Sequence, residues 1–252
     1  MIYRSLNVLS PVSLLLLWEL LSRTDVLDSR FFPPPSQVSL TFIDLTFGGG
    51  GLLGDLGVSL ARILGGFLLG AVPALVLGLA MGLLRPVRAA LDPLISFVYP
   101  VPKLAILPLL ILILGLGEAS KLAVIAIGVF FQVLINTVAG VLNIPALYFD
   151  AARNLGANRW AMYRTVALPG ALPTIFAGLK IAMGTAFLLI VAAEFVAAQS
   201  GIGYRVWNSW RTFDLGVMYS GLILLAVTGL VAQLLLATIQ SIFVPWQRPD
   251  RL

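Results

Sequence analysis

The sequence predicts an all-α polytopic membrane protein, and three observations support that fold class. Hydrophobic residues make up 60% of the 252 residues, charged residues make up only 11%, and the mean hydropathy is +1.01. A soluble domain carries about 25% charged residues, so an ordinary water-soluble protein is excluded. Several uncharged stretches also exceed the roughly 20 residues that cross the hydrocarbon of a bilayer as a helix.

The N-terminal part predicts a first span at residues 8–21, followed by a surface helix. No small-residue cleavage site ends the apolar run, so we interpret it as an uncleaved helix rather than a signal peptide. Three prolines at 33–35 predict an extended segment, and Ser36 is the expected N-cap of the next helix. Apolar residues recur in that helix at amphipathic spacing: Val38, Phe42 and Leu45.

The second and third spans are predicted to pack inside the protein. The second, at 58–84, contains the pairs Gly66/Gly70 and Gly78/Gly82, whose spacing lets helix backbones approach closely in lipid. The third, at 91–114, is interrupted by four prolines. A proline-broken helix persists at membrane depth only where protein or a water-filled cavity satisfies the freed backbone groups. We therefore expect this span in the interior of the assembly.

The remaining spans follow a long polar connection. We predict a fourth span at 122–142, a polar loop at 143–170, a fifth span at 172–198 and a sixth at 216–239. No tandem repeat or second domain is evident. The sequence therefore predicts a single transmembrane domain, residues 1–252, with six spans and both termini on the same side of the membrane.

The distribution of basic residues favours cytoplasmic termini. Of the 16 lysines and arginines, eight lie on the side of the termini, five on the other side and three in or near the spans. Short cytoplasmic loops carry an excess of basic residues in inner-membrane proteins. The same scattering between apolar spans explains the net charge of +5 without a nucleic-acid partner.

Missing residue types exclude several kinds of chemistry. The chain has no cysteine and no histidine. Thiol and imidazole catalysis are therefore excluded, and no metal site is expected. The G-x-x-x-x-G-K-[ST] phosphate-binding loop is also absent. We expect a protein that is not itself an enzyme and holds no cofactor.

The polar loop at 143–170 predicts two short helices separated by a glycine. Pro145 suits a first helical turn, and residues 146–155 are mostly good helix formers. Gly156 is expected to end this helix, because glycine adopts positive φ without steric cost. Asn158 can cap a second helix, which Pro169 is expected to end. Such a loop presents small and aromatic side chains to another protein.

This loop resembles the EAA loop of ATP-binding-cassette (ABC) importer permeases, whose pattern is E-A-A-x3-G-x9-I-x-L-P. Seven residues fall on its specified positions: Asp150, Ala151, Ala152, Gly156, Val166, Leu168 and Pro169. Aspartate replaces the glutamate and valine replaces the isoleucine. Further segments, among them 32–36, 115–121 and 200–204, are similar to the nitrate, sulfonate, taurine and bicarbonate branch of these permeases.

The resemblance implies a type I ABC importer permease fold with six transmembrane helices and a set of partners. Permeases of this family pair as two subunits, and a homodimer is the expected form here. Two cytoplasmic ABC ATPase subunits bind ATP and Mg, and a periplasmic or lipid-anchored substrate-binding protein delivers the solute. The EAA loop couples the permease to the ATPases. The implied solute is a small anion such as nitrate, a sulfonate, taurine or bicarbonate, carried across a bacterial inner membrane.

Ionisable residues within spans are the candidates for the solute path, because burying them in lipid is costly. Arg62 is a candidate for attracting an anion near the outer mouth, with an interfacial anchor as the alternative. Lys103, among the prolines of the third span, is a second anion candidate. For Glu194 the alternatives are capping or stabilising the cavity wall, gating the cavity together with a partner span, and a structural hydrogen bond across the dimer. Lys180 is expected to extend to the cytoplasmic interface.

Two other classes of protein are considered alongside the importer permease. One is a secondary transporter driven by an ion gradient, which often shows inverted repeats and central charges; no internal repeat is evident here. The other is a membrane-embedded enzyme, for which no catalytic cluster is visible among eleven acidic residues without histidine or cysteine.

Overall fold

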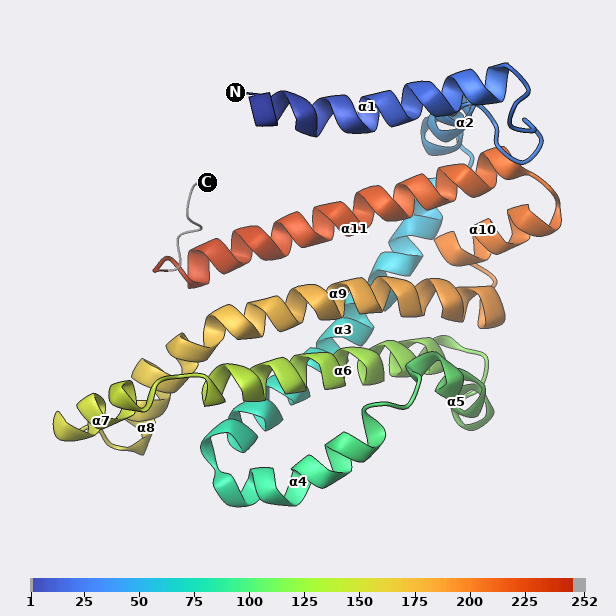
Figure 1. Cartoon of the computed structure of the whole chain (residues 1–252). Helices are drawn as coiled ribbons and strands as arrows, with labels where there is room; N and C mark the ends of the chain where they lie inside the picture. Colours follow the sequence, from blue (N-terminus) through green and yellow to red (C-terminus); the bar gives the residue numbers. More distant parts are fainter. Residues whose placement is uncertain (1, 247–252) are drawn as a thin grey trace. The chain divides into compact units, whose positions relative to one another are not determined.

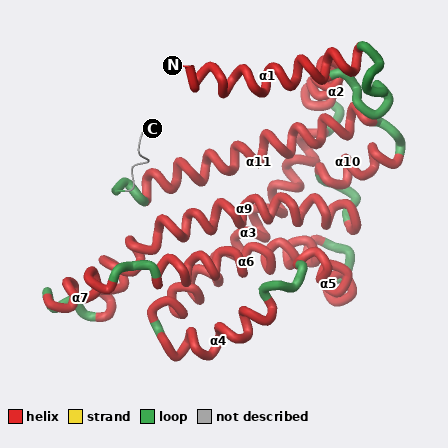
Figure 2. The backbone as a smooth tube through the Cα atoms, viewed as in Figure 1, coloured by secondary structure: helices red, strands yellow, loops and turns green. Residues whose placement is uncertain are grey.

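The computed structural model describes residues 2–246, with side chains described from residue 9 onward. Helices and loops make up all of this part of the chain (Figures 1 and 2). The chain forms two compact units, one of residues 1–59 and 199–227 and the other of residues 60–198 and 228–252. The C-terminal residues counted in the charge argument, Arg248 and Arg251, lie outside the described residues.

The first unit contains α1 (Ile2–Arg23), α2 (Pro35–Phe47) and α10 (Ile202–Arg211), together with the first residues of α3 and α11. The indole of Trp18 on α1 packs on the ring of Tyr219, with 5.6 Å between ring centroids. The Tyr219 hydroxyl donates a hydrogen bond to the Phe31 carbonyl at 3.1 Å. Aromatic packing and these loop contacts hold α1 and the start of α11 together.

Helix α2 begins differently from the prediction. Its N-cap is Pro34 rather than Ser36, and Ser36 lies in the first turn. The Ser36 backbone N–H and hydroxyl both donate to the carboxylate of Glu19, at 3.0 and 2.7 Å. The Glu19 side chain of α1 therefore accepts the hydrogen bond from a first-turn N–H that the N-cap side chain of α2 would otherwise accept. Gly48 follows the last residue of the helix.

The second unit is a helical bundle around α6 (Glu118–Leu142) and α9 (Leu168–Ala197), which lie side by side (Figure 1). Residues of α3 (Leu52–Leu83) join them in one apolar core, with Ile125, Leu134 and Ile190 fully buried. The tail of α11 (Leu215–Phe243) contributes Ala232 and Leu236 to the edge of this core. This core fixes the relative positions of the three helices that carry Arg62, Glu118 and Glu194.

The predicted role of the glycine pairs in helix packing is confirmed. A Cβ atom on Gly66 would lie 2.6 Å from the Cβ atom of Ile125, and one on Gly78 would lie 2.7 Å from that of Thr137. Both neighbours belong to α6. Only glycine permits α3 and α6 to approach this closely, and the glycines are used for packing rather than for lining a passage.

The third predicted span is broken, as the prolines indicated. Helix α4 (Arg85–Val98) is followed by a 3₁₀ turn, η1 (Lys103–Ile106), and by α5 (Leu107–Leu114), with a bend of 84° between the two parts. None of the side chains of α4 is fully buried within this chain. Leu107 at the start of α5 is nevertheless buried in the core, and the expected interior position of the span in the assembly stays a prediction.

Four helical segments among the described residues are long and apolar enough to cross a membrane: Leu52–Leu83, Glu118–Leu142, Arg159–Ala197 and Leu215–Phe243. The bent pair α4 and η1–α5 would make a fifth span. The predicted first span at 8–21 lies inside α1, which is only partly covered by the described side chains, and its membrane crossing stays a prediction. The full six-span topology stays a prediction.

Candidate functional site

The loop between α6 and α9 forms two short helices around a glycine, as predicted. Helix α7 covers Ala146–Asn154 and α8 covers Arg159–Met162. Between them Gly156 has φ +81°, a left-handed conformation that favours glycine. A Cβ atom there would meet no other atom within 4 Å, so backbone conformation, rather than lack of space, accounts for the glycine. The Asn158 side chain caps α8 by accepting a hydrogen bond from the Ala161 N–H at 2.8 Å.

Pro169 does not end the second helix, contrary to the prediction. A π-helical turn, η2 (Tyr163–Ala167), leads from α8 directly into α9, and Pro169 lies in the first turn of α9. Proline is tolerated in that position because the first N–H groups of a helix have no intrahelical partner. The helical path therefore runs from Arg159 to Ala197 without a loop.

The seven motif positions divide into an exposed tip and a half-buried base. Asp150, Ala151 and Gly156 at the tip are exposed, and Ala152 is partly covered. Val166, Leu168 and Pro169 at the base are half-buried. Val166 and Pro169 line a cavity of about 480 Å³ beside the loop, together with nine other residues: Gly140, Asn143, Ile144, Pro145, Tyr148, Thr165, Gly170, Thr174 and Trp246.

The tip exposes large apolar side chains that no other described residue covers. Leu155 is 88% exposed, Leu147 74% and Trp160 67%. No side chain of α7 is buried. The Trp160 ring stacks on that of Tyr163, with 5.3 Å between centroids, and so is held in place. Rigid, exposed aromatic and aliphatic side chains on a helical loop are typical of a protein-binding surface.

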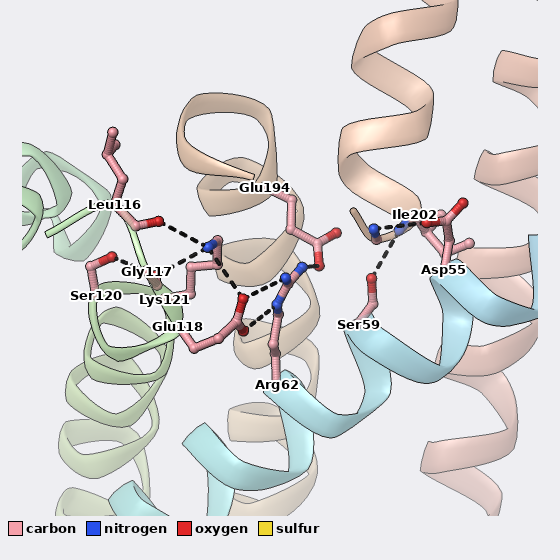
Figure 3. A network of polar contacts seen from close by, with 11 residues as sticks. Asp55, Ser59, Arg62, Leu116, Gly117, Glu118, Ser120, Lys121, Glu194 and Ile202 are labelled. Carbon is pink, nitrogen blue, oxygen red and sulfur yellow. Dashed lines mark hydrogen bonds and ion pairs between the residues drawn. The ribbon is translucent and has the colours of Figure 1, made fainter. Parts of the chain in front are cut away.

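At the opposite end of α6 and α9, an ionic cluster joins three helices (Figure 3). Arg62 of α3 donates from Nη1 to Glu194 Oε1 of α9 at 2.7 Å. Its Nε and Nη2 donate to the two carboxylate oxygens of Glu118, the first residue of α6, at 2.6 and 2.7 Å. Lys121 lies 3.5 Å from Glu118 and donates to the Gly117 carbonyl at 3.1 Å.

The members of this cluster differ sharply in exposure. Glu194 is fully buried, and the side chains of Arg62 and Lys121 are 5% and 3% exposed, whereas that of Glu118 is 58% exposed. Buried charges are costly unless they are paired and hydrogen-bonded. Two cations and two carboxylates provide that pairing here.

Sequence reasoning placed Arg62 and Glu194 on separate spans and did not pair them. The hydrogen bond of Glu194 is made within the chain, to α3, so the predicted bond across the dimer is not needed to explain its burial. Glu118 and Lys121 were missed as cluster members. Their spacing of three residues, which places them on one face of α6, was the available signal.

The other two charged candidates also hydrogen-bond to protein atoms. The ammonium group of Lys103 donates to the carbonyls of Val98, Tyr99 and Val101 at 3.0, 2.6 and 2.8 Å. It therefore satisfies backbone acceptors at the break between α4 and η1. Lys180 donates to Gln240 Oε1 of α11 at 2.6 Å, and its expected extension to the cytoplasmic interface stays a prediction.

In the first unit, α3 binds the start of α10. The Asp55 carboxylate accepts hydrogen bonds from the Gly201 N–H at 3.0 Å and from Arg205 Nε at 2.6 Å. One turn further on, Ser59 Oγ accepts from the Ile202 N–H at 2.9 Å. Two side chains thus cap α10. The α10 helix carries Trp207 and Trp210 with ring centroids 4.8 Å apart.

Comparison with known proteins agrees with this arrangement. The family described as binding-protein-dependent transport system inner membrane component matches residues 52–249. The chain is 33% identical over 246 residues to the taurine transport system permease protein TauC of Escherichia coli, covering 96% of this chain and 90% of TauC. It is 34% identical over 195 residues to the nitrate import permease protein NrtB of Leptolyngbya laminosa, covering 77% of this chain and 70% of NrtB.

The fold also matches a solved structure. A chain from the inward-facing conformations of the MetNI methionine ABC transporter superposes with a TM-score of 0.61 at 21% sequence identity. The match covers 76% of this chain and 95% of the other. At this identity the comparison supports the type I importer permease fold and no statement about the solute.

Proposed function

Because this chain belongs to the family of binding-protein-dependent transport system inner membrane components, we propose that it works as a homodimer. The dimer forms the translocation path of an ATP-driven importer and binds two cytoplasmic ABC ATPase subunits. A periplasmic or lipid-anchored binding protein delivers the solute. ATP and Mg are bound by the ATPases, and this chain holds no cofactor.

The observation that carries the proposal is the geometry of the α6–α9 loop. Asp150, Ala151, Ala152 and Gly156 present a helix and a left-handed turn to solvent, beside the exposed Leu155. An amphipathic helix that lays apolar side chains into a groove is a recurring way of recognising a partner protein. The given sequence contains no phosphate-binding loop, which supports the proposal that a separate subunit hydrolyses ATP.

The packed helices α6 and α9 can transmit a displacement of the loop to the opposite side of the membrane. Helix α6 has 25 residues, a length of about 37 Å at 1.5 Å per residue. The loop joins the two helices at one end, and the Arg62 cluster joins them to α3 at the other. A displacement of the loop by the ATPases would therefore move this bundle as a unit, shifting the population between inward-facing and outward-facing states.

The loop and both chain termini face the cytoplasm in this proposal, and the protein lies in a bacterial inner membrane. The excess of basic residues on that side supports this orientation. For the solute, we propose a small oxyanion of the sulfonate, taurine, nitrate or bicarbonate class. The names of TauC and NrtB support the taurine and nitrate members of this class.

Co-purification tests the partners directly. The tagged chain is isolated in mild detergent from its native membrane, and the proteins that accompany it are identified by mass. The proposal expects a subunit that carries a phosphate-binding loop. Isolation of the chain without an ATPase at several detergent strengths, while the dimer stays intact, would contradict it and would favour a transporter driven by an ion gradient.

A further inference from the structure

The Arg62 guanidinium divides its hydrogen bonds between a buried and an exposed carboxylate. Nη1 binds Glu194, which is fully buried near the end of α9. Nε and Nη2 bind the two oxygens of Glu118 at 2.6 and 2.7 Å, and the Glu118 side chain is 58% exposed. In Figure 3 the Glu118 carboxylate lies between the side chains of Arg62 and Lys121.

The Nε and Nη2 pair of an arginine is a rigid fork that matches two oxygens of one oxyanion. Carboxylates, sulfonates and nitrate all present such a pair of oxygens. In this structure Glu118 supplies the oxygens. Unlike Glu194, it has a side chain open to solvent, so an oxyanion from solution can reach the fork by taking its place.

The charge balance of the cluster favours replacement by an anion over simple loss of Glu118. With Glu118 in place, Arg62 and Lys121 are balanced by two carboxylates. If Glu118 turns away, one positive charge remains uncompensated on side chains that are at most 5% exposed. Lys121 keeps its hydrogen bonds to the carbonyls of Leu116 and Gly117, at 3.3 and 3.1 Å, so its charge stays beside the fork. An oxyanion would restore neutrality.

We propose that the Nε/Nη2 fork of Arg62, together with Lys121, is an oxyanion subsite that Glu118 occupies in this structure and vacates for a solute oxyanion. The identification of that oxyanion with the transported solute rests on the proposed function. The site itself lies within one chain and at the end of α6 opposite the coupling loop. Arg62 thus attracts an anion by exchanging partners rather than by presenting a free charge.

The test measures oxyanion binding to the purified full-length permease by thermal unfolding. Sodium nitrate and sodium ethanesulfonate are titrated against sodium chloride at constant ionic strength. Glu118→Gln keeps the size of the side chain and removes its charge, which weakens an internal competitor for the fork. The nitrate concentration that gives half of the maximal thermal stabilisation, the midpoint, should therefore fall by at least about tenfold. Asp28→Asn, which removes the carboxylate of the exposed Arg30 pair, should leave the midpoint unchanged.

Two further variants keep the result decisive. Arg62→Lys retains the charge but has no fork. It should therefore abolish the difference between the thermal stabilisation by nitrate and that by chloride. If Glu118→Gln does not fold, Glu118→Asp is used instead. It shortens the side chain, which moves the carboxylate away from the fork, and should also lower the midpoint. An unchanged midpoint in these Glu118 variants would overturn the proposal. Equal stabilisation by chloride would also overturn it, because it would reveal an adventitious ion only.

This binding assay tests the oxyanion subsite independently of the importer function. Stabilisation by nitrate is measured without ATP or ATPase, so it reports the subsite whether or not the chain is part of an importer. Normal ATP-driven uptake with no oxyanion effect on Glu118→Gln would reject the subsite alone. Oxyanion binding without ATP-driven uptake would instead reject the proposed function.

Discussion

Arg62 Nη1 and Glu194 Oε1 lie 2.7 Å apart in the apolar interior, although 132 residues separate them in the sequence. Their ion pair joins α3 to α9, and the bond of Arg62 to Glu118 extends it to α6. A buried ion pair adds little to stability compared with an apolar pair, but breaking one leaves a buried charge without compensation. The cluster therefore joins α3, α6 and α9 through buried charges that depend on one another for compensation.

Removing the buried carboxylate should cost much more than removing the exposed one. Glu194→Gln leaves a buried guanidinium short of one negative charge, and we expect a loss of about 3–5 kcal/mol in the free energy of unfolding. Glu118→Gln leaves the buried Arg62–Glu194 pair in place and changes a side chain that is 58% exposed, so it should cost less than Glu194→Gln. Unfolding of both variants in the same detergent compares them; equal losses would contradict this account of the cluster.

The close contact between α3 and α6 predicts a position-specific response to larger side chains. Gly66→Leu should destabilise the protein by about 1–3 kcal/mol, because the new side chain would displace Ile125 in a packed core. Gly184→Leu is the matched control, since a Cβ atom at Gly184 in α9 meets nothing within 4 Å. Thermal unfolding of the two variants tests the prediction, which fails if Gly184→Leu is the more damaging change.

Trp160 should be an anchor for the ATPase. Trp160→Ala removes a stacked, 67% exposed indole from the loop, and we expect a loss of about 2 kcal/mol in ATPase binding, typical of an interface hot spot. Trp210→Ala on α10, where the indole is 53% exposed, serves as the control. Binding of the purified ATPase to each variant is measured. Similar weakening by both would show that loss of an exposed tryptophan, rather than the loop, is responsible.

Gly156 should be required for coupling but not for folding. Gly156→Asp places a side chain at φ +81°, at a cost of order 1–3 kcal/mol, and adds bulk and charge to the loop tip. We expect normal membrane insertion with loss of ATP-driven uptake. Gly49→Asp is the control, because Gly49 has φ +87° and equally open surroundings outside the loop. Normal uptake by Gly156→Asp would remove the main support for a coupling role.

The loop geometry and the glycine-mediated packing of α3 on α6 were predicted from the sequence, whereas most side-chain partners on other helices were not. Gly156 and Asn158 follow from the conformational preferences of their own residues, so the loop geometry could be derived. The same reasoning failed at Ser36, because the cap of α2 comes from Glu19 on another helix. It also failed at Pro169, because a π-helical turn joins α8 to α9.

The ionic cluster illustrates the limit most clearly. Arg62 and Glu194 were recognised as costly residues to bury. The partner that each one binds, however, depends on how α3 and α9 pack. Spacing along the chain carries no information on a contact between residues 132 positions apart. The same limit applies to Lys103. The prolines predicted the broken helix, but only the structure reveals that the Lys103 ammonium group donates to carbonyls at the break.

Uptake into sealed vesicles tests the central claim most directly. The permease, its co-purified ATPase and its binding protein are reconstituted, and uptake of radiolabelled taurine and nitrate is followed with ATP supplied to the ATPase side. We predict that uptake of at least one of them requires ATP and continues when ionophores dissipate ion gradients. Uptake that proceeds without ATP and stops with the ionophore would contradict the account and identify a gradient-driven transporter.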